Sequence, residues 1–201
     1  MSAPTVEASP PRRLDADARR AQLVQAGLDL LKVRPFDAVG AVEVAAAVGV
    51  TKGLVFHYFP TQRDLQVAVA KAAADELVAA LETDPSMSND QRLAMGLDAF
   101  VGYIEQNPEA YVAVARGAGA NDQLLQVYED GRDRIAQLIF DGLGLTDPPP
   151  ALRIGIRGWI AGVEEAVIQW LDGRPIPREE LVELLRRAGL ALLDATVPQG
   201  S

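Results

Sequence analysis

Residues 40–59 read GAVEVAAAVGVTKGLVFHYF and decide the fold of the N-terminal part of the chain. Their apolar spacing predicts a short helix over residues 41–48. Gly49 follows this helix, and glycine just past a helix end readily takes the left-handed conformation that a tight reversal needs. Thr51 then provides a suitable N-cap for a second short helix, which continues to residue 59.

The spacing of small and branched residues in this stretch predicts how the two helices pack. Ala45 is small enough to let the helices approach, Gly49 lies four residues later in the turn, and Val55 lies six residues beyond it on the inward side. This is the spacing of a helix-turn-helix, whose second helix turns its polar side chains toward a DNA groove.

A longer run over residues 48–65 reads VGVTKGLVFHYFPTQRDL. It resembles the recognition segment of the TetR family of one-component transcriptional repressors, which reads roughly AGVSKGTLYxHFxSKExL. The Lys-Gly pair, the aromatic-rich Phe-His-Tyr-Phe run and the following Pro-Thr fall in register. Residues 20–36 look like the first helix of that family, so the resemblance covers about residues 15–70. Beyond them the chain resembles the family only in length and in its all-helical layout.

The resemblance implies that the second helix of the motif binds a double-stranded DNA operator. Lys52 can pair with a phosphate or with guanine, and the hydroxyl of Thr51 suits a phosphate. For His57 an exposed side chain without a role is the alternative. The candidate DNA-binding residues are Thr51, Lys52, Gly53, His57, Tyr58, Gln62 and Arg63.

Two positions depart from the family pattern. The family usually has Thr near the start of the second helix, where Gly40 or Ala41 stands here, and Lys where Gln62 stands. Because relatives contact phosphates at both positions, we expect weaker phosphate contacts in this chain. Arg63 lies one residue out of register for taking over one of them.

The composition limits the chemistry that the chain can perform. Of its 201 residues, 49% are hydrophobic and 23% are charged, which is typical of a globular protein. With no cysteine and a single histidine, it has no disulfide, thiolate metal site or multi-histidine metal site. The only histidine lies in the motif helix, so we predict no catalytic residues, no metal, no cofactor and no enzymatic activity.

The N-terminus has no apolar core typical of a secretory signal, and no apolar run is long enough to span a bilayer. A cytoplasmic location without a membrane partner is therefore expected. The net charge is −9, yet residues 1–65 carry eight Lys and Arg against seven Asp and Glu, which leaves +1 there and −10 in the remainder. The acidity thus lies outside the predicted DNA-binding part, although accidental solvation explains a difference of this kind too.

The helix and turn signals predict an all-α fold of about nine helices. We expect a flexible tail over residues 1–14 and a helix-turn-helix DNA-binding domain over residues 15–65. A connecting helix over about residues 62–82 leads to a ligand-binding and dimerisation domain over residues 83–201. The connecting helix begins at a Thr-x-x-Asp sequence and the next helix at Ser-x-x-Gln, and both are capping-box patterns.

If the resemblance extends to the C-terminal part, this part holds a cavity for a small-molecule effector. Its helices are rich in Leu, Val, Tyr and Trp, so we expect an apolar or aromatic effector. For each aromatic candidate ordinary core packing is the alternative, and for each charged one a solvated face. The candidate lining residues are Tyr103, Tyr111, Arg116, Tyr128, Trp159 and Glu164.

The last two predicted helices carry the features of a homodimer interface. Glycines recur at steps of three and four residues in one helix, and leucines line one face of the other. Together, two such helices from each subunit predict a four-helix interface. Its candidate residues are Gly155, Gly158, Gly162, Leu181, Leu184, Leu185 and Leu192.

These observations predict a ligand-responsive transcriptional regulator. In this interpretation a dimer represses by binding a palindromic operator, and a small apolar or aromatic effector releases it. The alternative is an all-helical ligand-binding or scaffold protein whose DNA-binding module has decayed.

Overall fold

The computed structural model describes residues 15–117 and 122–196, and the expected tail over residues 1–14 lies outside them. Within these ranges the chain forms nine α-helices, one 3-10 helix and no strand, which confirms the predicted all-α class. In chain order the elements are α1 (Ala16–Leu31), η1 (Phe36–Ala38), α2 (Ala41–Val48), α3 (Lys52–Tyr58), α4 (Gln62–Ala80), α5 (Asn89–Gln106), α6 (Pro108–Gly117), α7 (Asp122–Gly142), α8 (Pro150–Leu171) and α9 (Arg178–Thr196).

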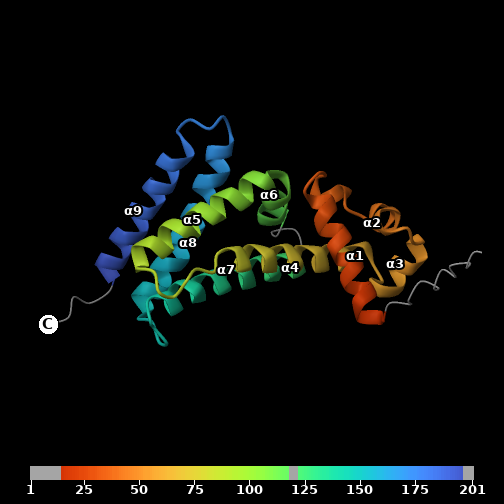
Figure 1. Ribbon diagram of the computed structural model, residues 1–201, viewed down its shortest axis with the longest axis horizontal. Coiled ribbons are helices and arrows are strands. Elements are labelled where there is room, and N and C mark those ends of the chain that lie inside the picture. Colours follow the sequence, from red (N-terminus) through yellow and green to blue (C-terminus); the bar gives the residue numbers. More distant parts are fainter. Residues whose placement is uncertain (1–14, 118–121, 197–201) are drawn as a thin grey trace, which may run out of the picture.

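The helices are arranged along one long axis (Figure 1). Helices α1, α2 and α3 form one end of the molecule, and α8 and α9 lie toward the other end. Between them α4 packs along α7. With 19 residues, α4 is about 28 Å long. It therefore extends from the N-terminal helices deep into the C-terminal part.

A separate hydrophobic core holds the N-terminal helices together. Leu23, Val44, Val55 and Val69 are fully buried in it and come from α1, α2, α3 and α4. Helices α1 and α4 approach closely at Gly27, where an added Cβ would lie 2.4 Å from a methyl group of Val69. The orientation of α3 is thus set by this shared apolar core and by its packing against α2.

Two further apolar clusters form the C-terminal core, one of residues from α4, α5, α8 and α9 and one between α7 and α8. Leu125 of α7 is 41% exposed, while its neighbour Leu124 packs into the N-terminal core. Successive helical residues point about 100° apart, so a shift of one position exchanges the buried and exposed side chains.

Both predicted capping boxes are present. Thr61 and Asp64 begin α4, and Ser88 and Gln91 begin α5, with reciprocal side-chain to backbone hydrogen bonds in each pair. None of the described helices combines the length and apolar character needed to cross a bilayer.

Candidate nucleic-acid interface and internal cavities

The turn between α2 and α3 has the backbone conformation that its sequence predicts. Gly49 has φ 69° and ψ 36°, in the left-handed region, and its N–H donates to the carbonyl groups of Ala45 and Ala46. The N–H of Val50 also donates to the carbonyl of Ala45, at 2.9 Å. These bonds satisfy the C-terminal carbonyls of α2 and fix the point at which α3 begins.

Helix α3 has one buried side and one exposed side. Val55, and Phe59 just beyond the helix, are 0% and 1% exposed and anchor it in the core. Lys52, Gly53 and His57 are exposed, and nothing but Thr51 Oγ1, at 3.9 Å, approaches the position of a Cβ at Gly53. This side can therefore approach another molecule closely without rearrangement.

Side chains near both ends of α3 contact neighbouring residues. Thr51 is the N-cap, and its hydroxyl accepts a hydrogen bond from the N–H of Leu54 at 3.3 Å. The ring of His57 lies edge-on to that of Tyr58, with 5.2 Å between centroids. The hydroxyl proton of Thr51 remains available for a phosphate, because the cap uses only a lone pair.

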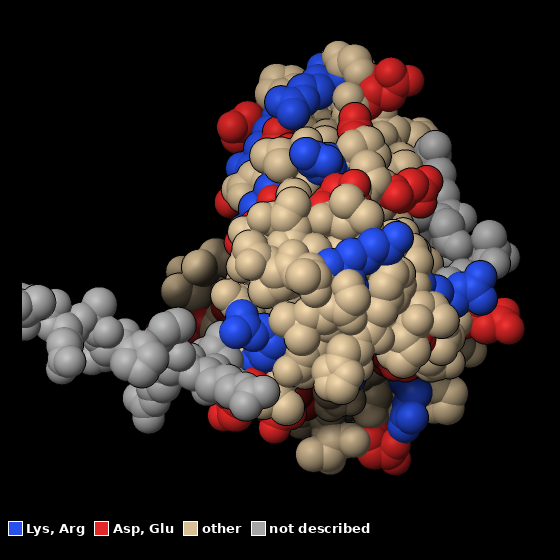
Figure 2. Space-filling model, turned by 90° about the vertical axis from the view of Figure 1, so that its right-hand side faces the viewer, with Lys and Arg blue, Asp and Glu red and all other residues tan. Residues whose placement is uncertain are grey.

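Basic groups reach this end of the molecule from several elements. Lys52 Nζ lies 5.4 Å from the centre of the Phe56 ring, and the guanidinium of Arg20 lies 4.9 Å from that of Phe59. Figure 2, which views this end directly, shows Lys and Arg side chains as separate patches on a largely uncharged surface. The positive charge at this end of the molecule is thus divided among separate Lys and Arg side chains.

Gln62, one of the positions that depart from the family pattern, contacts the start of α2. Its Oε1 accepts from the N–H of Ala41 at 3.1 Å, and its Nε2 donates to the carbonyl of Val39 at 3.2 Å. Gly40, the N-cap of α2, has no side chain to make such a bond. An added Cβ at Gly40 would lie 2.7 Å from Gln62 Nε2 and 2.8 Å from Glu43 Oε2, so a side chain there would require these two flexible side chains to move.

Two cavities border described helices of the C-terminal part and share Ile135 of α7 as a wall. Cavity 1 lies between α5, α7 and α8, has a volume of about 830 Å³ including its mouth, and is lined mainly by apolar side chains. Trp159 lines it and donates its indole N–H to the carbonyl of Leu185 at 3.2 Å. Arg92 closes one side through bonds to Thr83 and the Gly142 carbonyl.

Cavity 2 has a volume of about 780 Å³ including its mouth and lies nearer the N-terminal helices, since Leu28 and Leu31 of α1 line it. The structure brings together here four residues named from the sequence, namely Tyr103, Tyr111, Tyr128 and Glu164. The side chain of Arg116 lies outside the described part of the structure. Arg132, which the sequence did not single out, also lines the cavity.

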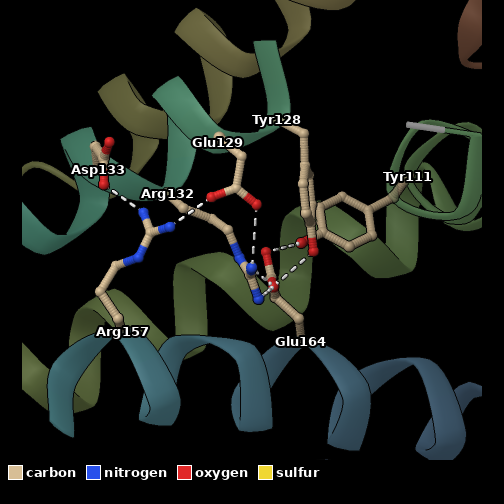
Figure 3. Close-up of polar contacts among 7 residues, drawn as sticks. All are labelled: Tyr111, Tyr128, Glu129, Arg132, Asp133, Arg157 and Glu164. Carbon is tan, nitrogen blue, oxygen red and sulfur yellow. Dashed lines mark hydrogen bonds and ion pairs between the residues drawn. The ribbon is translucent and has the colours of Figure 1, made fainter. Parts of the chain in front are cut away.

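A polar cluster joins α6, α7 and α8 beside cavity 2 (Figure 3). The carboxylate of Glu164, which is 4% exposed, accepts hydrogen bonds from the hydroxyls of Tyr111 at 2.9 Å and Tyr128 at 2.8 Å. Arg132 donates to the same carboxylate through Nε at 2.8 Å and Nη2 at 2.6 Å. Four donors thus surround one buried carboxylate.

This cluster continues toward the surface through a second arginine. Glu129 lies 3.6 Å from Arg132 and also pairs with Arg157 of α8, which in turn pairs with Asp133. Charges of opposite sign therefore alternate from the solvent to the interior, and each arginine contacts two carboxylates (Figure 3).

Burial and the neighbouring carboxylate keep the tyrosines of the cavity uncharged. Burial, followed by the charge of Glu164, raises the pKa of Tyr111 and of Tyr128 far above that of free tyrosine. Burial and Glu76 raise the pKa of Tyr103 to about 12. For Arg132 burial lowers the pKa, but Glu164, Tyr128 and Glu129 together outweigh it and the net shift is upward. At neutral pH these hydroxyls are hydrogen-bond donors.

The spacing of Tyr128 and Arg132 was the one signal by which the sequence could have revealed this cluster. Residues four apart share a helix face, and the Arg132 guanidinium indeed lies 4.8 Å from the Tyr128 ring centre. Their partner Glu164 is 32 residues further along the chain than Arg132, so local spacing cannot indicate it. Among the described residues no group of His, Asp and Glu is placed to hold a metal ion.

Two family models match the chain. That of the bacterial regulatory proteins of the tetR family matches residues 23–69, and that of the tetracyclin repressor-like C-terminal domain matches residues 89–192, more than half of the chain.

The chain belongs to the TetR family. Its members are DNA-binding transcriptional regulators and not enzymes, so the predicted family and class of function are confirmed.

Relatives resemble this TetR-family chain over most of its length. The HTH-type transcriptional activator FasR of Mycolicibacterium smegmatis is 29% identical over 181 residues, which cover 85% of this chain and 81% of FasR. A tetR-family regulator from Streptomyces coelicolor is 29% identical, with a TM-score of 0.81 over 93% of this chain and 85% of its own. The multidrug binding protein EbrR, solved with proflavin, shares the fold at 23% identity, with a TM-score of 0.64 over 85% of this chain and 99% of its own.

The candidate dimer residues of this TetR-family chain fall into two groups. Leu181 and Leu185 are buried in the core of the subunit, and Leu192 packs against Gly155, where an added Cβ would lie 2.6 Å from a methyl group of Leu192. These residues therefore pack against other residues of the same subunit. By contrast, Gly158, Gly162 and Leu184 are exposed, and no atom lies within 4 Å of a Cβ position at either glycine.

Proposed function

We propose that this chain is a dimeric, effector-controlled repressor that binds a near-palindromic operator through α3 of each subunit. The observation that carries the proposal is the exposed side of α3, where Lys52, Gly53 and His57 stand free while Val55 and Phe59 fix the helix in the core. Helix-turn-helix proteins place a helix of this kind in the major groove. Such a role also places the proposed site of action in the cytoplasm.

The support for a dimer is the solvent-exposed apolar surface on α8 and α9. Ile154 is 74% exposed and Leu184 is 58% exposed, although both are large aliphatic residues. Gly158 and Gly162 on α8 leave room for a second helix to approach closely. We therefore assign the interface to Ile154, Gly158 and Gly162 of α8 with Leu184 of α9, and omit Leu181, Leu185, Leu192 and Gly155.

The support for a small-molecule effector is the pair of cavities in the C-terminal part. The nearly apolar lining of cavity 1 favours an apolar or aromatic compound, because such a lining provides few partners for polar groups. Cavity 2 adds hydroxyl groups beside an apolar wall formed partly by α1. An effector here would contact elements of both parts of the chain.

The route from the cavities to α3 passes through α4 and α6. Helix α4 contributes to the N-terminal core and also lines cavity 2, while α6, which holds Tyr111, contacts η1 of the N-terminal part. An effector that binds the DNA-free arrangement more tightly shifts α3 out of its DNA-bound spacing. A coupling of about 1–3 kcal/mol would weaken operator binding roughly 5–150-fold.

The direct test is binding to DNA from around its own gene. Protection of a palindromic segment by the full-length protein, with affinity that falls steeply as salt rises, is the expected result. Equal, weak binding to the segment and to a scrambled duplex would remove the DNA-binding proposal. It would leave the alternative of a ligand-binding or scaffold protein.

The direction of regulation needs its own test, because the relative FasR is an activator. Where the operator lies relative to the promoter decides whether occupancy blocks or aids transcription. We propose repression, so deletion of the gene should raise expression of a reporter behind the protected segment. A fall in expression would identify an activator.

A further inference from the structure

Glu164 is the one charged residue that is buried among those the structure describes. Its carboxylate faces cavity 2, next to the rings of Tyr111 and Tyr128. A carboxylate with aromatic rings beside it is the arrangement that attracts an organic cation, through charge and through the negative faces of the rings. On these two features alone, cavity 2 would select cationic ligands.

Arg132 already occupies the position that such a cation would take. Its Nη2 lies 2.6 Å from Glu164 Oε2, and its Cζ lies 4.8 Å from the centre of the Tyr128 ring. It thus makes both interactions that a bound cation would make. Glu129, 3.6 Å away, holds its remaining amino group, and only 17% of the Arg132 side chain is exposed (Figure 3).

We propose that Arg132 is a specificity-determining residue that closes cavity 2 to cations and reserves it for uncharged ligands. A cation would meet a carboxylate that is already paired and a guanidinium that repels it. An anion would have to draw Arg132 away and leave Glu164 buried without a counter-charge.

An uncharged ligand avoids both costs, and the tyrosines provide its polar contacts. Tyr111 and Tyr128 donate their hydroxyl protons to Glu164, so their oxygens remain available as acceptors. A planar uncharged aromatic compound, with or without a hydrogen-bond donor on its edge, is therefore the class of ligand that cavity 2 fits. The inference rests on the proposed effector control only where it concerns the role of cavity 2 in the cell. The ligand preference itself is measured without DNA.

Two dyes with the same ring system test the proposal, namely acridine, which is uncharged near neutral pH, and proflavin, which is a cation. By fluorescence titration, wild type should bind acridine about tenfold or more tightly than proflavin, and Arg132→Gln should bind proflavin about tenfold or more tightly than wild type does. The matched control is Arg134→Gln, which removes an exposed arginine paired with Asp75 on the surface and should change neither affinity.

A double variant shows whether the gain in proflavin binding depends on Glu164, and it covers the case in which Arg132→Gln alone does not fold. Arg132→Gln with Glu164→Gln leaves no unpaired buried charge, so it should fold and should lose the gain in proflavin binding. The proposal is wrong if wild type binds proflavin as tightly as acridine or does not bind acridine. It is also wrong if the double variant keeps the gain. Failure of acridine to release operator DNA would count against the proposed function alone, because the preference between the dyes would stand.

Discussion

Each side chain that faces the proposed DNA site is positioned by residues that would not touch DNA. Lys52 is placed by the left-handed turn at Gly49, and the whole of α3 is oriented by Val55, which is fully buried. Thr51 contributes one lone pair to the helix cap. At this scale, binding and folding residues are therefore separable by substitution.

Replacing Lys52 with alanine should weaken DNA binding without affecting folding, because its side chain is exposed. If Lys52 contacts a phosphate, the slope of log affinity against log salt should become shallower by about 1 for each site lost. If it reads guanine, the loss should be about 1–3 kcal/mol at one base position. Salt titrations on selected and scrambled duplexes measure both, with Lys71→Ala, an exposed lysine on α4, as control. Unchanged binding would exclude Lys52 from the interface.

Gln62 takes the place of an N-cap side chain for α2, so its loss should reduce stability. Gln62→Ala leaves the N–H of Ala41 without its acceptor and should lower the free energy of unfolding by about 1 kcal/mol in urea titrations. Arg63→Ala, at the exposed neighbouring position, should change it by less than about 0.5 kcal/mol.

A second substitution checks that Gln62 and Gly40 depend on each other. Gly40→Ser should be less favourable in the wild-type chain than in the Gln62→Ala variant, because the new Cβ would lie 2.7 Å from Gln62 Nε2. Additive effects of the two substitutions would show that the two positions do not depend on each other.

Helix α8 serves two different surfaces. One side carries Glu164 into the polar cluster and Trp159 into cavity 1, and the other exposes Ile154, Gly158 and Gly162. Residues next to each other in sequence thus have unrelated roles, and matched substitutions on this helix separate the two.

Gly158→Arg should convert the proposed dimer into a monomer that remains folded. No atom lies within 4 Å of the new Cβ, and a helix interior gains about 0.5–1 kcal/mol when glycine is replaced, so the subunit itself should tolerate the change. Sedimentation at micromolar concentration measures the outcome, and Ala21→Arg on the exposed side of α1 is the control. A wild-type monomer under the same conditions would contradict the proposed interface.

Glu164→Gln should be far more destabilising than Glu165→Gln. Removing the buried carboxylate leaves Arg132 with only the more distant Glu129, and breaking a buried ion pair in this way costs about 3 kcal/mol or more. Glu165 is exposed, and its replacement should cost less than about 0.5 kcal/mol. The comparison is made by urea unfolding, and similar costs for both would mean that the cluster does not stabilise the fold.

The elongated molecule places the proposed dimer surface and the DNA-binding helices toward opposite ends (Figure 1). Helices α4 and α7 run side by side between them. In a dimer joined through α8 and α9, the distance between the two copies of α3 therefore depends on the angle between the subunits. A small change of that angle moves each α3 by a larger distance.

The spacing of operator half-sites should be fixed by this geometry. Two recognition helices in successive major grooves lie about 34–36 Å apart, or one turn of DNA. Inserting about five base pairs between the half-sites turns one of them to the opposite side of the duplex, so affinity should fall about a hundredfold or more. The same insertion outside the half-sites is the control. Binding that tolerates the central insertion would contradict a rigid dimer on two half-sites.

Local signals in the sequence determined the helices and the binding motif. The turn at Gly49, the capping boxes at Thr61 and Ser88 and the buried Val55 were all predicted, because each depends on residues within a few positions of one another. The resemblance over residues 15–70 predicted the family for the same reason, since a recognition helix is a continuous segment.

Only the tertiary structure decided how the helices meet. The pairing of Arg132 with Glu164, the capping of α2 by Gln62 and the burial of Leu124 in place of Leu125 depend on which helix faces come together. The same packing assigns Leu181 and Leu185 to the core of the subunit and leaves Leu184 exposed. Apolar residues recur at helical spacing in the sequence, but this spacing leaves open how each helix is rotated about its axis. A rotation by one residue, about 100°, exchanges which of two neighbouring side chains is buried, and only the packed partner helices select the rotation.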